Sequence, residues 1–197
     1  CSSDLIAKVV EKFGRIDVLV NNAGVGEFIP AQELTLEDYD RTMNVNVRGL
    51  VATIIHAIPH MKDGGKIINI SSVHAERMPF RGGGVYAMSK FAVKGLTQGF
   101  ARDLAERGIN VNSIQPGPID TDMNPADGPG AAGMHALMAI KKHGKPADIA
   151  KYREVYRQLG WDEARAQRHR RLLDAGLLPA GAKLSPRDTR ATSWTEA

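Results

Sequence analysis

The sequence predicts one α/β domain, a doubly wound parallel sheet with helices between its strands. Helix-like and strand-like segments alternate from residue 4 to residue 115, and the turns between them are short. The strand-like segments are short and continuously apolar, which is typical of strands buried on both faces of a parallel sheet. Each of them ends in small or polar residues, at the edge where such sheets bind ligands.

Three apolar runs predict the strands. They cover residues 16–20, 66–70 and 109–115. The residues that follow them are Asn21–Gly24 (NNAG), Ser71–Ser72 and Pro116–Gly117. Because the carboxyl ends of parallel strands meet at one edge, we expect these three stretches to converge on one crevice.

Helical periodicity predicts helices before and between these strands. They cover residues 4–13, 35–61 and 85–107. Gly14 and Gly108 stand where C-terminal caps are expected, and Thr35 with Asp38 opens a capping box. Pro59 and the glycines at 64 and 65 should stop the middle helix.

The third strand is followed by a long segment, residues 117–145, rich in Gly, Pro and Asp. A loop of this length at the ligand edge is typical of a substrate lid. Its apolar stretch at 134–140 (MHALMAI) is expected to be helical and would otherwise be exposed. A disordered surface loop is the alternative.

The composition is that of an ordinary globular domain, with 43% hydrophobic and 24% charged residues. No apolar run approaches the roughly 20 residues that span a bilayer, and no signal-peptide pattern opens the chain. The single cysteine, Cys1, excludes an internal disulfide and fits a reducing compartment. We therefore expect a cytoplasmic protein with no membrane partner.

The net charge of +4 is unevenly distributed. Residues 151–197 hold 10 Lys and Arg against 6 Asp and Glu, so the whole excess lies in this tail. The tail lacks the spacing of a nucleic-acid motif, and we expect no nucleic-acid partner. We divide the chain into a catalytic portion, 1–150, and this atypical tail, which has one helical stretch (152–177) and a disordered end from Gly181. The tail is either a reading-frame shift in the gene or a genuine extension.

Two residues, Tyr86 and Lys90, form a candidate general acid/base pair. Tyr86 and Lys90 are four positions apart on the third helix, so both side chains share one face. A tyrosine is a poor proton donor at neutral pH, and a neighbouring ammonium should lower its pKa and make it a general acid. Ser72 ends the preceding strand, and the polar Asn46 stands amid apolar helix residues and needs a partner.

Together, the stretches NNAG, NVNVRG, ISS, Tyr86-x-x-x-Lys90 and PGPIDTDM resemble the short-chain dehydrogenase/reductase family over roughly residues 5–150. The resemblance implies a Rossmann-like fold and an NAD(P)(H)-dependent enzyme that interconverts a carbonyl and a secondary alcohol. NADP(H) is favoured over NAD(H). The stretch QPGPIDTDMNPADGP is similar to a 3-oxoacyl-carrier-protein-reductase-like bacterial subgroup and, more closely, to a regulatory relative that binds a cyclic dinucleotide.

The resemblance also implies the role of each matching residue. Tyr86 would donate the proton, Lys90 would lower its pKa and bind the nicotinamide ribose, and Ser72 would orient the substrate carbonyl. Asn46 would hold a water of the proton relay. The residues implied to line the cofactor site are Asn22, Ala23, Gly24, Tyr86, Lys90, Pro116, Gly117, Ile119 and Thr121. No metal is implied.

The sequence departs from the family pattern in two places. The opening strand, glycine-rich turn and first helix are not seen, which corresponds to about 60–75 residues. A sheet without its central strands should expose apolar edges and faces. The resemblance also stops near residue 150. Two alternatives to the enzyme thus stay open: a nucleotide-binding regulator on the same scaffold, and an inactive fragment. In family members, the helices equivalent to 35–61 and 85–107 pack against a partner subunit. The resemblance therefore also implies a homodimer or homotetramer.

Four further side chains are candidates for contact with the small-molecule substrate. They are Phe28, His74, Met78 and Phe80, although packing residues have the same sequence pattern. His56 and His60 have the i, i+4 spacing of a metal pair, but no third ligand accompanies them, and we expect no metal site. The spacing from Ser72 to Tyr86 is one residue longer than the commonest family pattern because of the segment RGGG, which either shifts Ser72 or bulges.

Overall fold

The computed structural model describes residues 2–147 and, beyond them, residues 166, 170, 173, 174, 181 and 183. The chain forms two compact units, Cys1–Gly117 and Pro118–Ala197, each of which is described by itself. The predicted helix and disordered end of the tail therefore lie outside the described residues, apart from these six positions.

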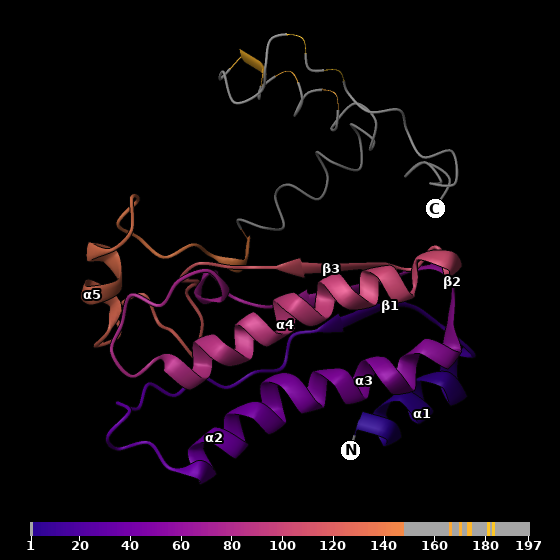
Figure 1. Cartoon of the computed structure of the whole chain (residues 1–197), viewed down its shortest axis with the longest axis horizontal. Coiled ribbons are helices and arrows are strands. Elements are labelled where there is room, and N and C mark those ends of the chain that lie inside the picture. The colour runs from indigo at the N-terminus through magenta and orange to yellow at the C-terminus, as the bar shows by residue number, and fades with distance from the viewer. Residues whose placement is uncertain are drawn as a thin grey trace. The chain divides into compact units, whose positions relative to one another are not determined.

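The first unit contains a three-stranded parallel sheet with the strand order β1-β2-β3 (Figure 1). The strands are β1 (Ile16–Asn21), β2 (Met61–Ile70) and β3 (Asn110–Ile114). Asn21 lies beside Asn69, and Ile70 beside Ile114. The parallel α/β fold predicted from the apolar runs is thus confirmed, and the carboxyl ends of all three strands lie at one edge.

The helices of the first unit begin and end close to the predicted positions. They are α1 (Ser2–Phe13), α2 (Leu36–Met43), α3 (Leu50–Ala57) and α4 (Gly84–Asp103). Gly14 and Gly108 have φ angles of 76° and 64°, the left-handed backbone expected of C-terminal caps. Thr35 and Asp38 form the predicted capping box, in which each side chain accepts a hydrogen bond from the other's backbone N–H.

The helical segment predicted over 35–61 contains one feature that periodicity does not show. Residues Asn44–Gly49 form a π-helix between α2 and α3, a local widening that is frequent at functional sites. A 3₁₀ turn, Ile58–His60, ends the segment, and β2 begins at Met61 rather than at the predicted residue 66. Gly64, with φ 79°, therefore lies inside β2 and does not stop the helix.

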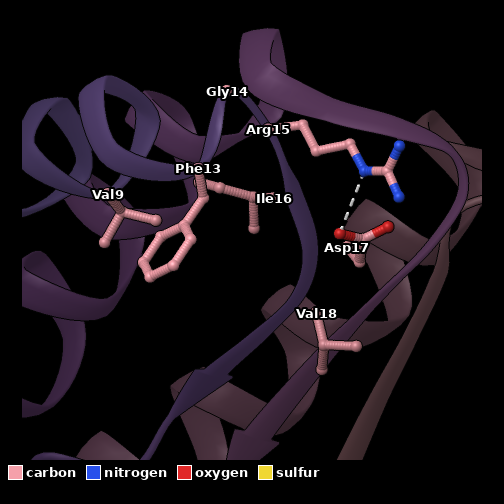
Figure 2. A pocket seen from close by; sticks show the side chains of 7 residues that line it. All are labelled: Val9, Phe13, Gly14, Arg15, Ile16, Asp17 and Val18. Carbon is pink, nitrogen blue, oxygen red and sulfur yellow. Dashed lines mark hydrogen bonds and ion pairs between the residues drawn. The ribbon is translucent and has the colours of Figure 1, made fainter.

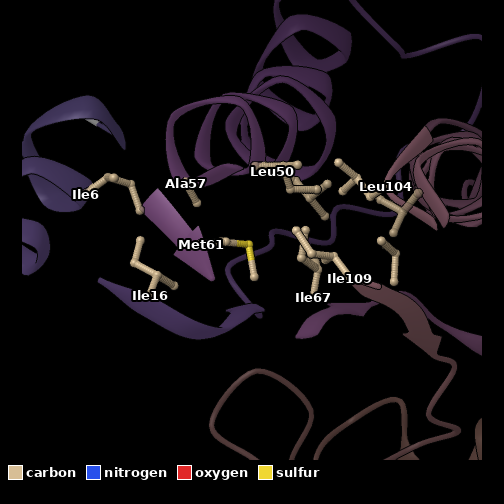
Figure 3. Packing of buried hydrophobic residues seen from close by; sticks show 11 residues of the cluster. Ile6, Ile16, Leu50, Ala57, Met61, Ile67, Leu104 and Ile109 are labelled. Carbon is tan, nitrogen blue, oxygen red and sulfur yellow. The ribbon is translucent and has the colours of Figure 1, made fainter. Parts of the chain in front are cut away.

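The apolar core lies between the helices and one face of the sheet (Figure 3). It is built from α1, α3 and α4 packed on alternate residues of the strands. Its members are Ile6, Ile16, Leu50, Ile54, Ala57, Met61, Ile67, Val93, Leu104, Ile109 and Val111. Ile54 and Ile67 are fully buried at its centre.

The opposite face of the sheet is open, so the prediction that the strands are buried on both faces is wrong for this unit. Val18, Val20 and Ile114 are 51%, 54% and 40% exposed. The register places Val20 beside Ile68, which is half-buried. The expectation of an exposed apolar face is confirmed.

A row of polar side chains crosses the buried face of the sheet near its carboxyl edge. Thr53 on α3 donates to Asn21 (2.7 Å), Asn21 to Asn69 (2.9 Å), and Asn69 to Thr97 on α4 (3.0 Å). Asn69 is fully buried and Asn21 is 8% exposed. The row ties both helices to both strands close to the carboxyl edge of the sheet.

The second unit is described over residues 118–147 and contains α5 (Ala131–Ala136), shifted from the predicted 134–140. Ile119 pairs with Gly144, and Thr121 with Asn124. In the part of the chain that the structure describes, no helix is long and apolar enough to cross a bilayer.

Candidate active site

Backbone hydrogen bonds join the segments that follow β2 and β3. The N–H of Ser71 donates to the carbonyl of Ile114 (2.8 Å), and that of Val73 to the carbonyl of Pro116 (3.0 Å). These bonds continue the parallel ladder beyond both strands and hold Ser72 at the carboxyl edge. The Ser72 hydroxyl oxygen also accepts a bond from the N–H of His74 (3.2 Å), and Ser72 is only 6% exposed.

Tyr86 and Lys90 lie on the first turns of α4 and face this edge. The Nζ atom of Lys90 is 5.8 Å from the centre of the Tyr86 ring and donates to the carbonyl of Ile70 at 3.1 Å. The Ser71 hydroxyl donates to the carbonyl of Lys90 at 2.9 Å, which fixes the helix against the end of β2. Burial of Lys90, which is 6% exposed, lowers the pKa of its ammonium group.

Burial raises the pKa of Tyr86 above its ordinary value of 10, and a hydrogen bond with the Ser72 hydroxyl opposes this rise. The direction of the shift differs from the expectation that Lys90 makes Tyr86 more acidic. Desolvation of the buried phenol is the larger cause of the shift, and Ser72 lowers the pKa by a smaller amount.

Asn46 occupies the π-helix, and its amide holds the segment that follows β1. Its Oδ1 accepts from the N–H of Val25 (2.8 Å), and its Nδ2 donates to the Val25 carbonyl (2.9 Å) and to the Ser89 hydroxyl (3.0 Å). The Ser89 hydroxyl in turn donates to the carbonyl of Tyr86 (2.7 Å). Asn46 thus links the loop after β1 to the first turn of α4.

Sequence reasoning missed Ser89, which is fully buried and joins Asn46 to the first turn of α4. The signal was a small polar residue between Tyr86 and Lys90 on the apolar face of a helix. A buried hydroxyl there needs a partner, just as Asn46 did.

Gly24 leaves space that a side chain would fill. A Cβ atom at this position would lie 3.3 Å from Oδ1 of Asn46 and 3.4 Å from Nζ of Lys90. The backbone therefore passes directly over the two polar groups. Asn22 and Ala23, the other predicted cofactor residues of this stretch, are exposed beside it.

The remaining predicted cofactor residues fall into different units. Pro116 and Gly117 end the first unit beside Val73, whereas Ile119 and Thr121 belong to the second. The structure therefore brings together Asn46, Ser72, Tyr86, Lys90 and the NNAG stretch, and describes Ile119 and Thr121 separately.

Of the four candidate substrate contacts, three lie around Tyr86. The ring centres of Phe28 and His74 are 5.7 and 6.0 Å from that of Tyr86. Phe80 contacts both of them, at 6.3 and 5.5 Å. Met78 instead packs against Gly83, whose missing side chain makes room for it.

The segment RGGG bulges against the loop after β1. Gly82 has φ 82°, and a Cβ there would lie 2.9–3.1 Å from the backbone of Phe28 and Ile29. The extra residue is therefore accommodated in a turn that only glycine fits, while the backbone bonds of Ser71 and Val73 keep Ser72 at the carboxyl edge.

A pocket beside β1 lies away from this chemistry (Figure 2). It is lined by Val9, Phe13, Gly14, Arg15, Ile16, Asp17 and Val18, and an ion pair of 3.2 Å joins Arg15 to Asp17. These residues belong to the end of α1 and the amino end of β1, opposite the carboxyl edge. Among the described residues, no three or more His, Cys, Asp or Glu side chains form a group that could hold a metal ion. His56 and His60 are therefore not part of such a group.

The family model of short chain dehydrogenases matches residues 2–131. The chain belongs to this family. It is similar to the cyclic-di-GMP-binding biofilm dispersal mediator protein of Escherichia coli, with 47% identity over 147 residues, 75% of this chain and 62% of that protein. A hydroxynaphthalene reductase-like protein of Metarhizium brunneum is 42% identical over 64% of this chain and 47% of its own length.

A solved structure shows the same fold. A short chain dehydrogenase from Burkholderia cenocepacia, in complex with NADP, is 46% identical and superposes with a TM-score of 0.74, over 76% of this chain and 61% of that one. The chain thus spans less than two thirds of the length of these relatives.

Proposed function

We propose that this short-chain dehydrogenase is an oxidoreductase that interconverts a carbonyl and a secondary alcohol with NADP(H). The observation that carries the proposal is the arrangement at the carboxyl edge of a parallel sheet. Ser72 lies there just after β2, and Nζ of Lys90 lies 5.8 Å from the centre of the Tyr86 ring and donates to the carbonyl of Ile70. This is the edge at which such sheets bind nucleotides. The proposal concerns the activity of the whole protein, since the chain spans less than two thirds of the length of its relatives.

The residues around Gly24 fit a nicotinamide cofactor. The backbone there lies against two polar groups with no side chain between, and Lys90 offers ammonium protons to ribose hydroxyls. The residues of the first unit that would hold the cofactor are Asn22, Ala23, Gly24, Tyr86, Lys90, Pro116 and Gly117. The bound nicotinamide supplies or accepts the hydride. The complexes of related structures with NADP or NADPH support NADP(H) over NAD(H).

In the direction of reduction, the carbonyl carbon gains a hydride and the carbonyl oxygen gains the hydroxyl proton of Tyr86. The Ser72 hydroxyl orients that oxygen. Lys90 stabilises the phenolate left on Tyr86, which regains its proton from solvent. Asn46 keeps the loop over the site through both polar groups of Val25, and we assign it the relay water as well.

Replacing Tyr86 with phenylalanine tests the proposal. The variant removes only the hydroxyl, so carbonyl-dependent oxidation of NADPH should fall at least about 100-fold. The affinity for NADPH, followed by thermal shift, should stay near the wild-type value. Tyr39→Phe, on α2, is the matched control and should turn over normally. Equal turnover by Tyr86→Phe and the wild type would contradict the proposal.

A nucleotide-binding regulator is the second candidate, favoured by the 47% identity to a cyclic-di-GMP-binding protein. A regulator should bind cyclic-di-GMP equally well as the wild type and as the Tyr86→Phe variant, because binding needs no proton transfer. An enzyme should show a turnover that depends on the hydroxyl. A chain that neither melts cooperatively nor responds to NADPH would contradict both candidates.

We also propose self-association through α3 and α4, as a homodimer or homotetramer. Ile55, Met88 and Phe91 are 56%, 41% and 46% exposed on these helices. Burial of such apolar side chains favours association. Light scattering on the eluting protein should give the mass of two or four chains, and a monomer would contradict the proposal.

A further inference from the structure

Four aromatic rings around the proposed proton donor form a closed set, in which each ring contacts the next. The set, called here the aromatic quartet, consists of Phe28, Phe80, His74 and Tyr86. The centres of successive rings are 6.3, 5.5, 6.0 and 5.7 Å apart in that order, with Tyr86 returning to Phe28. Contacts at these distances are typical of favourable aromatic pairs.

The loop that carries Phe28 is held at three places. Asn46 binds both polar backbone groups of Val25. Gly26 lies under the Tyr86 ring, where a Cβ would be 3.4 Å from Cε2. Gly82 then contacts the backbone of Phe28 and Ile29. The backbone that carries Phe28 is therefore held in place beside Tyr86, and a preorganised aromatic surface binds ligands at a low cost in entropy.

The quartet is built asymmetrically. Three of its rings are half-buried, and Phe28 is 51% exposed. His74 is oriented by its Nδ1 atom, which lies 3.2 Å from the carbonyl of Arg77. A carbonyl only accepts, so Nδ1 carries the hydrogen. Phe28 thus offers an aromatic face to a ligand, while the rings behind it are fixed by packing and by this bond.

We propose that the aromatic quartet is a substrate-positioning subsite, and that the substrates are ketones with an aromatic ring fused or joined to the reacting carbonyl. The inference rests on the proposed function. The substrate ring would stack on Phe28 and hold its carbonyl beside the Tyr86 and Ser72 hydroxyls. Phe28 is then a positioning residue, because it sets which carbonyl reaches the proton donor.

The kinetic test compares two bicyclic ketones of the same skeleton, 1-tetralone and its saturated analogue 1-decalone. The wild-type chain should reduce 1-tetralone with the higher kcat/KM. Phe28→Leu, which keeps an apolar side chain, should lower this preference about 2- to 13-fold, the range that one aromatic pair contributes. Phe13→Leu, an exposed phenylalanine of α1, should leave the preference unchanged. Reduction of both ketones with the same ratio in Phe28→Leu would overturn the subsite and leave the proposed function standing.

A binding measurement separates the subsite from turnover. Calorimetric titration of the chain with each ketone should give tighter binding of 1-tetralone, and Phe28→Leu should remove the difference. If neither ketone is reduced, the proposed function fails, and the titration alone decides the subsite. Equal affinity for both ketones, or an unchanged difference in Phe28→Leu, would overturn it.

Discussion

Truncation of Asn46 should loosen the loop that covers the active site before it affects the rest of the fold. Asn46→Ala removes an amide that makes three hydrogen bonds, two to Val25 and one to Ser89. Asn46 is 2% exposed, so water has little access to replace it. The backbone of Val25 loses the most hydrogen bonds, because its N–H and its carbonyl both bind the Asn46 amide.

The size of the effect follows from these contacts. Each polar group of the half-buried Val25 should lose about 1 kcal/mol, and Ser89 about 0.5 kcal/mol, since its hydroxyl keeps the bond to the Tyr86 carbonyl. The cavity left by the amide adds a little more. We expect the free energy of unfolding to fall by about 2–3 kcal/mol and Tm by roughly 4–12 °C.

Three measurements check this. Thermal unfolding gives the loss of stability, and hydrogen exchange should become faster at the Val25 amide. Carbonyl reduction should fall at least tenfold because the Phe28 loop no longer holds its position. Asn44→Ala changes an exposed asparagine of the same π-helix and should stay within about 0.5 kcal/mol of the wild type. A Tm within 1 °C of the wild type, with exchange at Val25 unchanged, would refute the reasoning.

Two further substitutions test the neighbouring features. Gly82→Ala should lower the free energy of unfolding by about 2 kcal/mol or more, because alanine is strained at φ 82° and its Cβ would press on the backbone of Phe28 and Ile29. The control is Gly84→Ala, where a Cβ meets nothing within 4 Å, and it should leave the free energy of unfolding unchanged in the same assay. Lys90→Met should abolish turnover yet leave the fold as stable or up to about 1 kcal/mol more stable at pH 7, since it removes a buried charge. The pKa of Lys90 is lower in the folded chain than in the unfolded chain. Between the folded-state pKa and 10.5, the unfolded chain therefore binds more protons than the folded chain. The wild type should thus gain stability relative to Lys90→Met as the pH rises through this window. A stability difference that does not change up to pH 10 would contradict this account of Lys90.

The sequence was most informative where local chemistry decides the structure. The capping box at Thr35, the glycine caps at 14 and 108 and the bounds of β1 and β3 were all predicted to within one residue. These features depend on a few adjacent residues, which is why a linear pattern contains them. The Tyr86 and Lys90 pair was found in the same way, because four residues on a helix bring two side chains to one face.

Features that depend on distant residues were not predicted. The π-helix at Asn44–Gly49 has no sequence pattern of its own, and β2 starts early because Met61 pairs with Ile16. The raised pKa of Tyr86 reflects burial, which the spacing to Lys90 does not contain. An apolar run also cannot say which of its faces is covered, and so the exposure of Val18 and Val20 was not foreseen from the strand itself.

The buried polar row explains why the strand register brings the proposed site residues to one edge of the sheet. Asn69 lies one residue before Ile70, whose carbonyl accepts from Lys90, and Thr97 lies on the same helix as Lys90. A slip of one residue in β2 would turn Asn69 to the open face and leave Asn21 and Thr97 buried without that partner. The same slip would also move Ser72 away from Tyr86. The register that satisfies the buried amides is therefore the one that places Ser72, Tyr86 and Lys90 at the same edge of the sheet.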